Sequence, residues 1–301
     1  MAGDLALLFP GQGAHDLRML DGVRRLPGFA ERHAIVAELL GRSPLEALAR
    51  EDVAFLNANR ATALLTVLVS SLALDAFVAA RGERPDFVAG YSVGTWTALH
   101  AAGSLPFERL AEVVAARAAA MDACFRDRAG AMLAVFGLLD ADVEGVCASL
   151  RAEGHAVWIG NHNCAGQATL SGAAASIAAA ESAFAALRPR KLVRVPVSGG
   201  WHSPLLALAR DAFLEVLART ELAAPRVPVV DNVTGGFLPT TRPALDVALA
   251  DHLDHPVRWE AGVRTLIAAG ARRFVEIGYG NVLTKFGLFI DRTAQHEAFG
   301  G

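Results

Sequence analysis

The sequence predicts an α/β fold in which a mostly parallel sheet carries a smaller inserted subdomain. At both ends of the chain, short apolar runs bounded by turn residues alternate with helical segments, and this alternation is typical of parallel sheets. The middle of the chain follows a different order of strands and helices, which indicates an insert. The length of 301 residues suits one large domain, or a large domain with a small one inserted in it.

The N-terminal elements begin the large subdomain. Residues 5–9 are apolar and are followed by Pro10 and Gly11, which predicts a buried strand and then a turn. Residues 61–80 approach the roughly 20 apolar residues of a membrane span. Threonine, serine and aspartate interrupt this stretch, so we expect a buried core helix and no association with a membrane. A short strand and two helices are then expected at 87–89, 95–102 and 107–125.

The middle segment has the order strand, helix, strand, strand, helix, strand, which is the ferredoxin-like pattern. We expect these elements at 131–138, 140–153, 156–160, 167–171, 173–187 and 191–196. Residues 131–198 are therefore assigned to a small subdomain, and residues 1–130 with 199–301 to the large one. The large subdomain continues with a helix, a strand, a helix, a strand and a last helix, expected at 204–219, 227–231, 259–269, 273–277 and from Asn281 onward.

Composition and charge exclude several classes of protein. A net charge of −3 argues against nucleic-acid binding, which needs a basic surface. The three cysteines, Cys124, Cys147 and Cys164, form no C-x-x-C pair, so we expect neither a metal site nor a disulfide framework. The N-terminus lacks the basic start and the long apolar core of a signal peptide. We therefore expect a cytoplasmic protein.

The pentapeptide Gly90-Tyr91-Ser92-Val93-Gly94 is a G-x-S-x-G motif between an expected strand and an expected helix. This context is typical of a nucleophile elbow, in which the serine side chain is exposed above the sheet. The helix start also places the Val93 N–H where it can stabilise an oxyanion. The alternative is an ordinary loop serine, because a serine hydroxyl is a poor nucleophile without a base.

The expected base is His202, in the stretch VPVSGGWHSPLL at a strand-to-helix junction. Junction loops often hold functional side chains, although His252 and His255 are competitors. A second oxyanion donor is expected from the Gln12 N–H, since the turn after the first strand lies at the carboxyl edge of the sheet. The alternative for Gln12 is a plain tight turn.

Further blocks extend these motifs along nearly the whole chain. They are FPGQGA (9–14), GYSVG (90–94), RAAAM (117–121), NHNCAGQATLSG (161–172), VPVSGGWHSPL (195–205), DNVTG (231–235), PVRW (256–259) and EIGYGNVL (276–283). In this order they resemble the malonyl-CoA:acyl-carrier-protein transacylases and the acyltransferase domains of fatty-acid and polyketide synthases. The resemblance implies an α/β-hydrolase-like large subdomain with a parallel sheet and an inserted ferredoxin-like small subdomain.

The resemblance also implies a role for each site residue. Ser92 would carry the acyl group as an ester, and His202 would act as base and then as acid. Gln12 and Val93 N–H groups would form the oxyanion hole. A backbone carbonyl would orient His202, at position 252, where the family usually has glutamine and this chain has His252. Supporting roles fall to Asn161, Asn163 and Asn232, whose alternative is simply to fix loops.

Specificity is expected from Arg117, whose family counterpart grips the free carboxylate of a malonyl-type group. Three positions around the expected acyl pocket depart from the family. Tyr91 replaces histidine, Ala61 replaces glutamine, and Trp201 replaces the phenylalanine of malonyl-selective members. The larger ring of Trp201 would restrict branching at the acyl α-carbon, or direct the pocket elsewhere. The expected substrate-binding residues are thus Arg117, Tyr91, Trp201, Ala61 and Met121.

The residues and the resemblance together predict a discrete, monomeric ping-pong acyltransferase of polyketide or fatty-acid biosynthesis. It would move malonyl or a related dicarboxylic unit from acyl-CoA or a carrier protein to an acyl carrier protein, with no tightly bound cofactor. Carrier proteins are acidic, so basic residues near the cleft are expected to dock them, although a solvated turn is the alternative. These residues are Arg188, Arg190, Lys191 and Arg194.

Several other functions stay open on the sequence. An acyl-thioester hydrolase would use the same serine and histidine with water as acceptor, and a transferase for a non-malonyl unit would differ only in its pocket. An ordinary esterase would need an acidic residue between the serine and the histidine, where Asp140 and Glu144 fall in the insert. A non-catalytic scaffold is disfavoured because both Ser92 and His202 are present.

Overall fold

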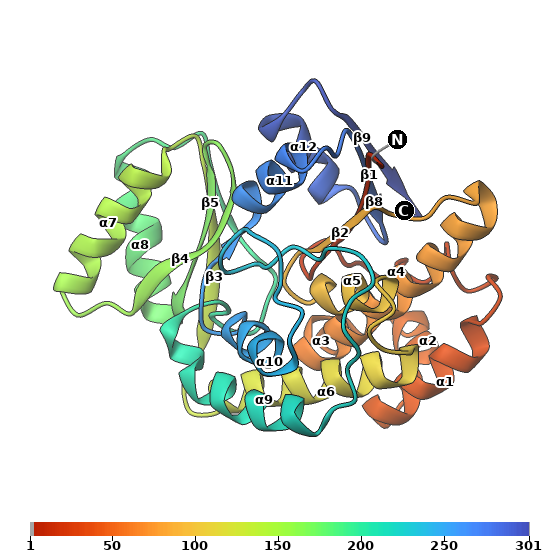
Figure 1. Cartoon of the computed structure of the whole chain (residues 1–301). Coiled ribbons are helices and arrows are strands. Elements are labelled where there is room, and N and C mark those ends of the chain that lie inside the picture. Colours follow the sequence, from red (N-terminus) through yellow and green to blue (C-terminus); the bar gives the residue numbers. More distant parts are fainter. Residues whose placement is uncertain (1–2, 301) are drawn as a thin grey trace.

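The computed structural model describes residues 3–300, which form two sheets (Figure 1). The sheet of the large subdomain has four strands, all parallel, where the sequence predicts a mostly parallel sheet. The edge strand at residues 295–299 was missed, because Gln295, His296 and Glu297 leave no apolar run there. In order across the sheet, the strands are β2 (Phe87–Gly90), β1 (Leu5–Phe9), β8 (Arg273–Ile277) and β9 (Gln295–Phe299).

Strand β1 lies inside this sheet and is buried on both faces. Leu5, Leu7 and Phe9 join one apolar core, and Ala6 and Leu8 join another on the opposite face. The first core is covered by α1 (Phe29–Leu40), α2 (Pro44–Ala49), α3 (Val53–Asn57), α4 (Asn59–Arg81), α5 (Gly94–Ala101), α6 (Phe107–Ala123), α9 (Ala207–Arg219) and α10 (Arg242–Asp251). The second core is covered by α11 (Trp259–Ala268) and α12 (Val282–Ile290).

Helix α4 contains the long apolar stretch of the sequence. Its length and composition would allow it to cross a membrane, but 72% of its most apolar window is buried inside the protein. It packs mainly against α6, and also against α1 and α5. The prediction of a buried core helix is therefore confirmed.

The prediction of a strand at 227–231 was wrong. Only isolated bridges occur there, between Val88 and Val229 and between Val230 and Phe237. Pro228 has no N–H to donate to a neighbouring strand, which limits pairing in this segment. The segment nevertheless lies beside β2, because the Val88 N–H donates to the Pro228 carbonyl and the Val230 N–H donates to the Val88 carbonyl.

The small subdomain has the predicted order β3 (Gly130–Phe136), α7 (Asp140–Ala152), β4 (Val157–Cys164), β5 (Gln167–Ala173), α8 (Ala174–Ala186) and β6 (Lys191–Arg194). Its strands lie in the order β6-β3-β5-β4, and each neighbouring pair is antiparallel. Its helices cover one face, at the left of Figure 1. A two-residue strand of the large subdomain, β7 (Val257–Arg258), pairs with β4 in parallel, so a segment of the large subdomain extends the sheet of the small one next to Asn161. The boundaries assigned at 130/131 and 198/199 stay a prediction.

Candidate active site

The turn around Ser92 is built where β2 ends and α5 begins, against the end of β1. Ser92 has a φ of +54°, in the left-handed region that side chains rarely adopt. Gly90 and Gly94 are needed here for close approach. A Cβ on Gly90 would lie 2.1 Å from the Gly94 carbonyl carbon, and a Cβ on Gly94 would lie 2.2 Å from the Phe9 oxygen. The glycines thus permit the packing, while the backbone strain falls on the serine.

Ser92 and His202 are in direct contact, with Ser92 Oγ 2.7 Å from His202 Nε2. On the other side of the ring, His202 Nδ1 lies 2.8 Å from the His252 carbonyl oxygen. Because a carbonyl only accepts, Nδ1 carries the proton and Nε2 is left free to accept the Ser92 hydroxyl. Burial, followed by the nearby Arg117 charge, lowers the pKa of His202 to about 3. The imidazole is therefore neutral near pH 7 and can act as a base.

The competing histidines are placed differently. The ring of His255 is exposed and contacts Asp254, and His252 reaches His202 through its backbone and not its ring. The His252 carbonyl thus lies where the resemblance implied an orienting carbonyl. In this site no carboxylate contacts His202, so the esterase arrangement with Asp140 or Glu144 is not formed; the Asp140 carboxylate instead contacts His162 at 2.5 Å.

Asn232 fixes the backbone of the elbow. Its Oδ1 accepts from the Ser92 N–H at 2.9 Å, and its Nδ2 donates to the Gly90 carbonyl at 2.8 Å. Its own carbonyl accepts from the Arg258 N–H at 2.7 Å. These bonds satisfy backbone groups that the strained turn cannot pair within itself. Asn232 is therefore placed to support the turn that carries Ser92, as expected of it.

The Pro10–Gly13 turn lies directly against the elbow. The Tyr91 N–H donates to the Phe9 carbonyl, and a Cβ on Gly11 would lie 2.6 Å from the backbone oxygen of Tyr91. The Gln12 side chain is held away from the serine, because its Nε2 donates to the backbone and side-chain oxygens of Asn59. Gln12 and Ser92 line the same small cavity. Val93 is the N-cap of α5, and the first N–H groups of a helix have no partner within it. Gln12 therefore borders the serine across the cavity and Val93 follows it in the chain, and their roles as oxyanion donors stay a prediction.

Arg117 lies on α6 and is only 2% exposed. Its Nη2 is 3.4 Å from Ser92 Oγ, a long contact. Within residues 3–300, no carboxylate lies within ion-pair distance of its guanidinium, although other arginines form 14 pairs with carboxylates. Burial lowers the pKa of Arg117 to about 10, which still leaves it charged near pH 7. An unpaired buried cation beside the serine is a ready site for an anionic group.

The cavity at Ser92 has a volume of about 70 Å³. Trp201 forms part of its wall, and its ring packs edge-on against Phe125. Ala61 and Met121 are buried in the large core and do not line this cavity, so their place in the acyl pocket stays a prediction. The lining residues are Gln12, Tyr91, Ser92, Met132, Asn161, Thr169, Val195, Val197, Trp201 and His202.

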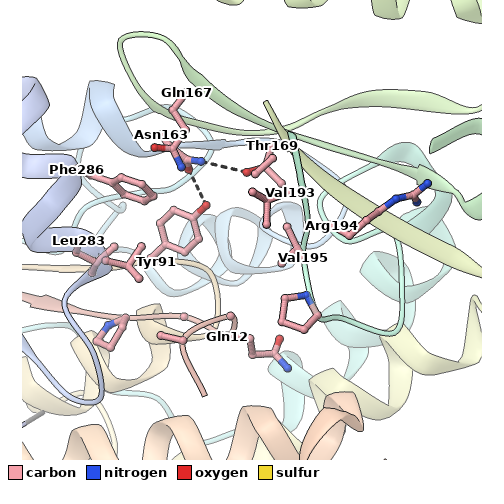
Figure 2. A pocket seen from close by; sticks show the side chains of 17 residues that line it. Gln12, Tyr91, Asn163, Gln167, Thr169, Val193, Arg194, Val195, Leu283 and Phe286 are labelled. Atoms are coloured by element: carbon pink, nitrogen blue, oxygen red, sulfur yellow. Dashed lines mark hydrogen bonds between the residues drawn. The ribbon is translucent and has the colours of Figure 1, made fainter. Parts of the chain in front are cut away.

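A second, mostly apolar cavity of about 220 Å³ lies between the two subdomains and shares residues with the first (Figure 2). Tyr91 belongs to both. Its hydroxyl donates to Asn163 Oδ1 at 2.7 Å, and its ring packs against Trp259 and Phe286. Asn163 Nδ2 in turn donates to Thr169 at 3.1 Å. Burial raises the pKa of Tyr91 far above its usual range, so the hydroxyl stays protonated as a donor.

The four basic residues expected to dock a carrier protein are all exposed, but they do not act as one group. Arg194 lines the cleft and is paired with Glu181 at 2.6 Å. Arg190 and Lys191 line a separate cavity of about 370 Å³ beside the exposed Phe289 of α12. Arg188 has a φ of +51° in the turn before them.

Two site features escaped the sequence reasoning. Asp231 is buried and contacts the His252 ring at 2.8 Å, and Asn59 joins the Gln12 turn to α6 through Asp122. The signal for Asp231 was its place directly before Asn232 in DNVTG. No local pattern indicated its partner, since the two residues are 21 positions apart.

The fold and the site define a serine-dependent acyl-transferring enzyme with an inserted ferredoxin-like subdomain. The chain belongs to the acyl transferase domain family, whose model matches residues 33–288. It is 32% identical over 283 residues to the malonyl CoA-acyl carrier protein transacylase of Bacillus subtilis, covering 93% of this chain and 88% of that protein. It is 31% identical to the polyketide biosynthesis malonyl CoA-acyl carrier protein transacylase BaeC of Bacillus velezensis, covering 93% and 94%.

A solved structure shares the whole architecture. It is the malonyl-transacylase PlMCAT in complex with AntF, a type II PKS acyl-carrier protein. The TM-score is 0.90 at 28% identity, and the match covers 98% of this chain and 95% of that one. The α/β class with two subdomains, predicted from the sequence, is therefore confirmed.

Proposed function

We propose that this protein moves a malonyl group, or a closely related dicarboxylic acyl group, from coenzyme A to an acyl carrier protein through an ester on Ser92. The observation that carries the proposal is the unpaired, buried Arg117 beside Ser92 Oγ. The free carboxylate of the acyl group would supply the missing partner through a bidentate pair. The names of the related transacylases support the same acyl group and acceptor.

In the first half-reaction, His202 Nε2 takes the proton of Ser92 as Oγ attacks the thioester carbonyl carbon. The oxyanion accepts from the backbone N–H groups of Gln12 and Val93. When the intermediate collapses, the C–S bond breaks and His202 returns the proton to the leaving sulfur of coenzyme A. The acyl group then stays on Ser92.

In the second half-reaction, the phosphopantetheine thiol of the carrier protein gives its proton to His202 and attacks the acyl ester. The C–O bond to Ser92 breaks, and His202 returns the proton to Oγ. Each step uses side chains and backbone groups of this chain, so we propose that no tightly bound cofactor takes part. The apolar cleft lined by Tyr91 and Phe286 offers the thiol arm a path to Ser92.

Carrier-protein docking is proposed beside this cleft, at the adjoining cavity that Arg190 and Lys191 line. Arg190 and Lys191 are exposed and have no acidic partner within residues 3–300, so they are available to an acidic surface. Arg194 is the weaker candidate because it is already paired with Glu181. Arg188 lies in the same basic turn. Charge reversal at Lys191 should slow transfer to the carrier at low salt more than acylation by coenzyme A thioester.

The deciding experiment mixes the protein with malonyl-CoA, with and without a phosphopantetheinylated carrier protein, and follows all species by intact mass. We expect a malonyl ester on Ser92 in the first case and malonyl-carrier in the second. Ser92→Ala should abolish both products. Free malonate released at the rate of coenzyme A, with no malonyl-carrier, would instead establish a thioester hydrolase.

Three finer points stay proposals. Tyr91 and Trp201 near the serine favour a specialised pathway such as polyketide biosynthesis, which a panel of acyl-CoA thioesters and carriers would test. Sedimentation equilibrium would test the proposed monomeric state. Fractionation of the producing cells would test a cytoplasmic location, with which the buried position of α4 is compatible.

A further inference from the structure

His252 contacts the site in two separate ways. Its backbone carbonyl accepts from His202 Nδ1, and its ring Nε2 lies 2.8 Å from Asp231 Oδ1. Both side chains of this second contact are deeply buried, with exposures of 4% and 6%. A residue that supplied only a backbone carbonyl would not need a buried polar ring with a carboxylate partner, since burying such groups is costly. The ring therefore calls for a function of its own.

Asp231 is ionised in this setting. Burial would raise its pKa, but the bond and charge of His252, together with donors from Thr234 and Val233, bring the pKa down to about 2. The ring nitrogen facing it must therefore carry a proton. The Asn232 N–H lies 3.2 Å from the same nitrogen, which cannot both donate and accept. The shorter, charge-assisted bond to Asp231 takes precedence.

His252 and Asp231 connect the residues that hold the base and the nucleophile. Asp231 is covalently followed by Asn232, whose side chain holds the Ser92 N–H and the Gly90 carbonyl. His252 in turn holds His202, which contacts Ser92 Oγ. The nucleophile and the base come from segments 110 residues apart in the chain. The contact between His252 and Asp231 joins the segment that holds the Ser92 turn to the segment that holds His202.

We propose that the His252 side chain, bonded to Asp231, positions Ser92 and His202 relative to each other. His252 is a positioning residue, because its ring does not reach the acyl group. Without the bond, the turn that begins at Asp231 and the carbonyl at the end of α10 move independently. The distance between Ser92 Oγ and His202 Nε2 is then no longer fixed, and displacements near 1 Å cost about 100-fold in rate. This inference rests on the proposed function only in taking Ser92 as the nucleophile.

The test measures the nucleophile without relying on the acyl group. A fluorophosphonate probe reacts with an activated serine: Oγ bonds to phosphorus, fluoride leaves, and the base takes the hydroxyl proton. We compare the maximal labelling rate and the probe affinity for wild type, His252→Leu, His252→Gln and Asp231→Asn. Every variant keeps the backbone carbonyl at position 252. Thermal unfolding of each variant is measured in parallel.

We expect His252→Leu to lower the maximal labelling rate by about 10- to 100-fold with little change in probe affinity. His252→Gln, which can donate an amide N–H to Asp231, should restore most of the rate. Asp231→Asn keeps the shape of the side chain and loses the charge, so it should give an intermediate rate and serves as the second test if His252→Leu does not fold.

The matched control is Thr265→Val. Thr265 Oγ1 donates to the Gly235 carbonyl at 2.6 Å and thus stabilises the same turn without touching the pair. It should lose stability but keep the wild-type labelling rate. Wild-type labelling in both His252→Leu and Asp231→Asn, or an equal loss in Thr265→Val, overturns the inference. Failure of the proposed function is distinguishable, because wild type would then label with the probe yet form no malonyl ester.

Discussion

The hydroxyl of Tyr91 donates to Asn163 across the cleft between the two subdomains, at 2.7 Å. Tyr91 directly precedes the nucleophile, and Asn163 lies on β4 of the small subdomain. The bond therefore connects the elbow to the opposite wall of the cleft through which the substrates would enter (Figure 2). The ring of Tyr91 packs against Phe286 and Trp259.

Replacing Tyr91 with phenylalanine should loosen this connection. The change leaves Asn163 Oδ1 without its donor, and a buried polar group left unpaired costs about 1 to 3 kcal/mol. We expect a lower unfolding temperature and a lower kcat/KM for malonyl transfer. The matched control is Tyr279→Phe, which removes the only other tyrosine hydroxyl, bonded to Asp16 at 2.6 Å. A kinetic loss of the same size in both variants would contradict a specific effect of Tyr91 on the cleft.

Arg117→Ala should impair the transfer of acyl groups that carry a carboxylate more than the transfer of uncharged acyl groups. Removing one partner of a desolvated charge pair typically costs about 2 to 5 kcal/mol, so kcat/KM for malonyl-CoA should fall at least about 30-fold. The fall for acetyl-CoA should be much smaller, because acetyl has no carboxylate. The ratio of the two kcat/KM values, measured in the same assay, decides the point. Equal losses would show that Arg117 does not select the acyl group.

The same residue should oppose folding in the absence of substrate. Among the residues that the structure describes, no carboxylate pairs with the buried Arg117, and desolvating an unpaired charge is costly. Arg117→Met, which keeps much of the side-chain volume, should therefore raise the free energy of unfolding measured in urea while abolishing malonyl selectivity. Lower stability in this variant would indicate that the guanidinium is favourably solvated in the free protein.

His202 should make stability fall as the solution becomes acidic. In the unfolded chain a histidine titrates near 6.5, whereas burial and then the Arg117 charge lower the pKa of folded His202 to about 3. Below pH 6.5 the unfolded chain binds a proton that the folded chain does not. The contribution to stability is thus complete above about pH 6.5 and falls by up to about 1.4 kcal/mol per pH unit below it.

The measurement is the free energy of unfolding of wild type and His202→Gln between pH 7.5 and 4.5. The difference in slope isolates His202 from three half-buried histidines, His15, His33 and His100, whose pKa values partial burial also lowers. We expect a shallower decline in His202→Gln. Parallel curves for the two proteins would mean that folded His202 accepts a proton near its usual pKa.

The sequence allowed the reacting pair to be predicted because its signals are local. A glycine-flanked serine between a strand and a helix, and a histidine at a strand-to-helix junction, each indicate a position without knowledge of the fold. The His252–Asp231 bond and the direction of the Tyr91 ring depend on contacts between distant segments, so no short pattern encodes them. The same reason explains β9, whose polar side chains form a strand only because β8 offers it an edge.

Trp201 is expected to limit the size of the acyl group. Its ring lines the cavity of about 70 Å³ at Ser92 and His202, and it is held against Phe125 with 5.3 Å between ring centroids. Trp201→Leu, which leaves a side chain smaller than the phenylalanine of malonyl-selective members, should enlarge the cavity and admit a methyl branch at the α-carbon. A methyl group in an apolar pocket is worth about 1 to 3 kcal/mol, so the preference for malonyl-CoA over methylmalonyl-CoA should fall about 10-fold or more. The control is Trp96→Leu, the same change in the core against Phe213, away from this cavity. Trp96→Leu should lower stability without altering the ratio of the two kcat/KM values, and an unaltered ratio in Trp201→Leu would place the selecting residue elsewhere in the pocket.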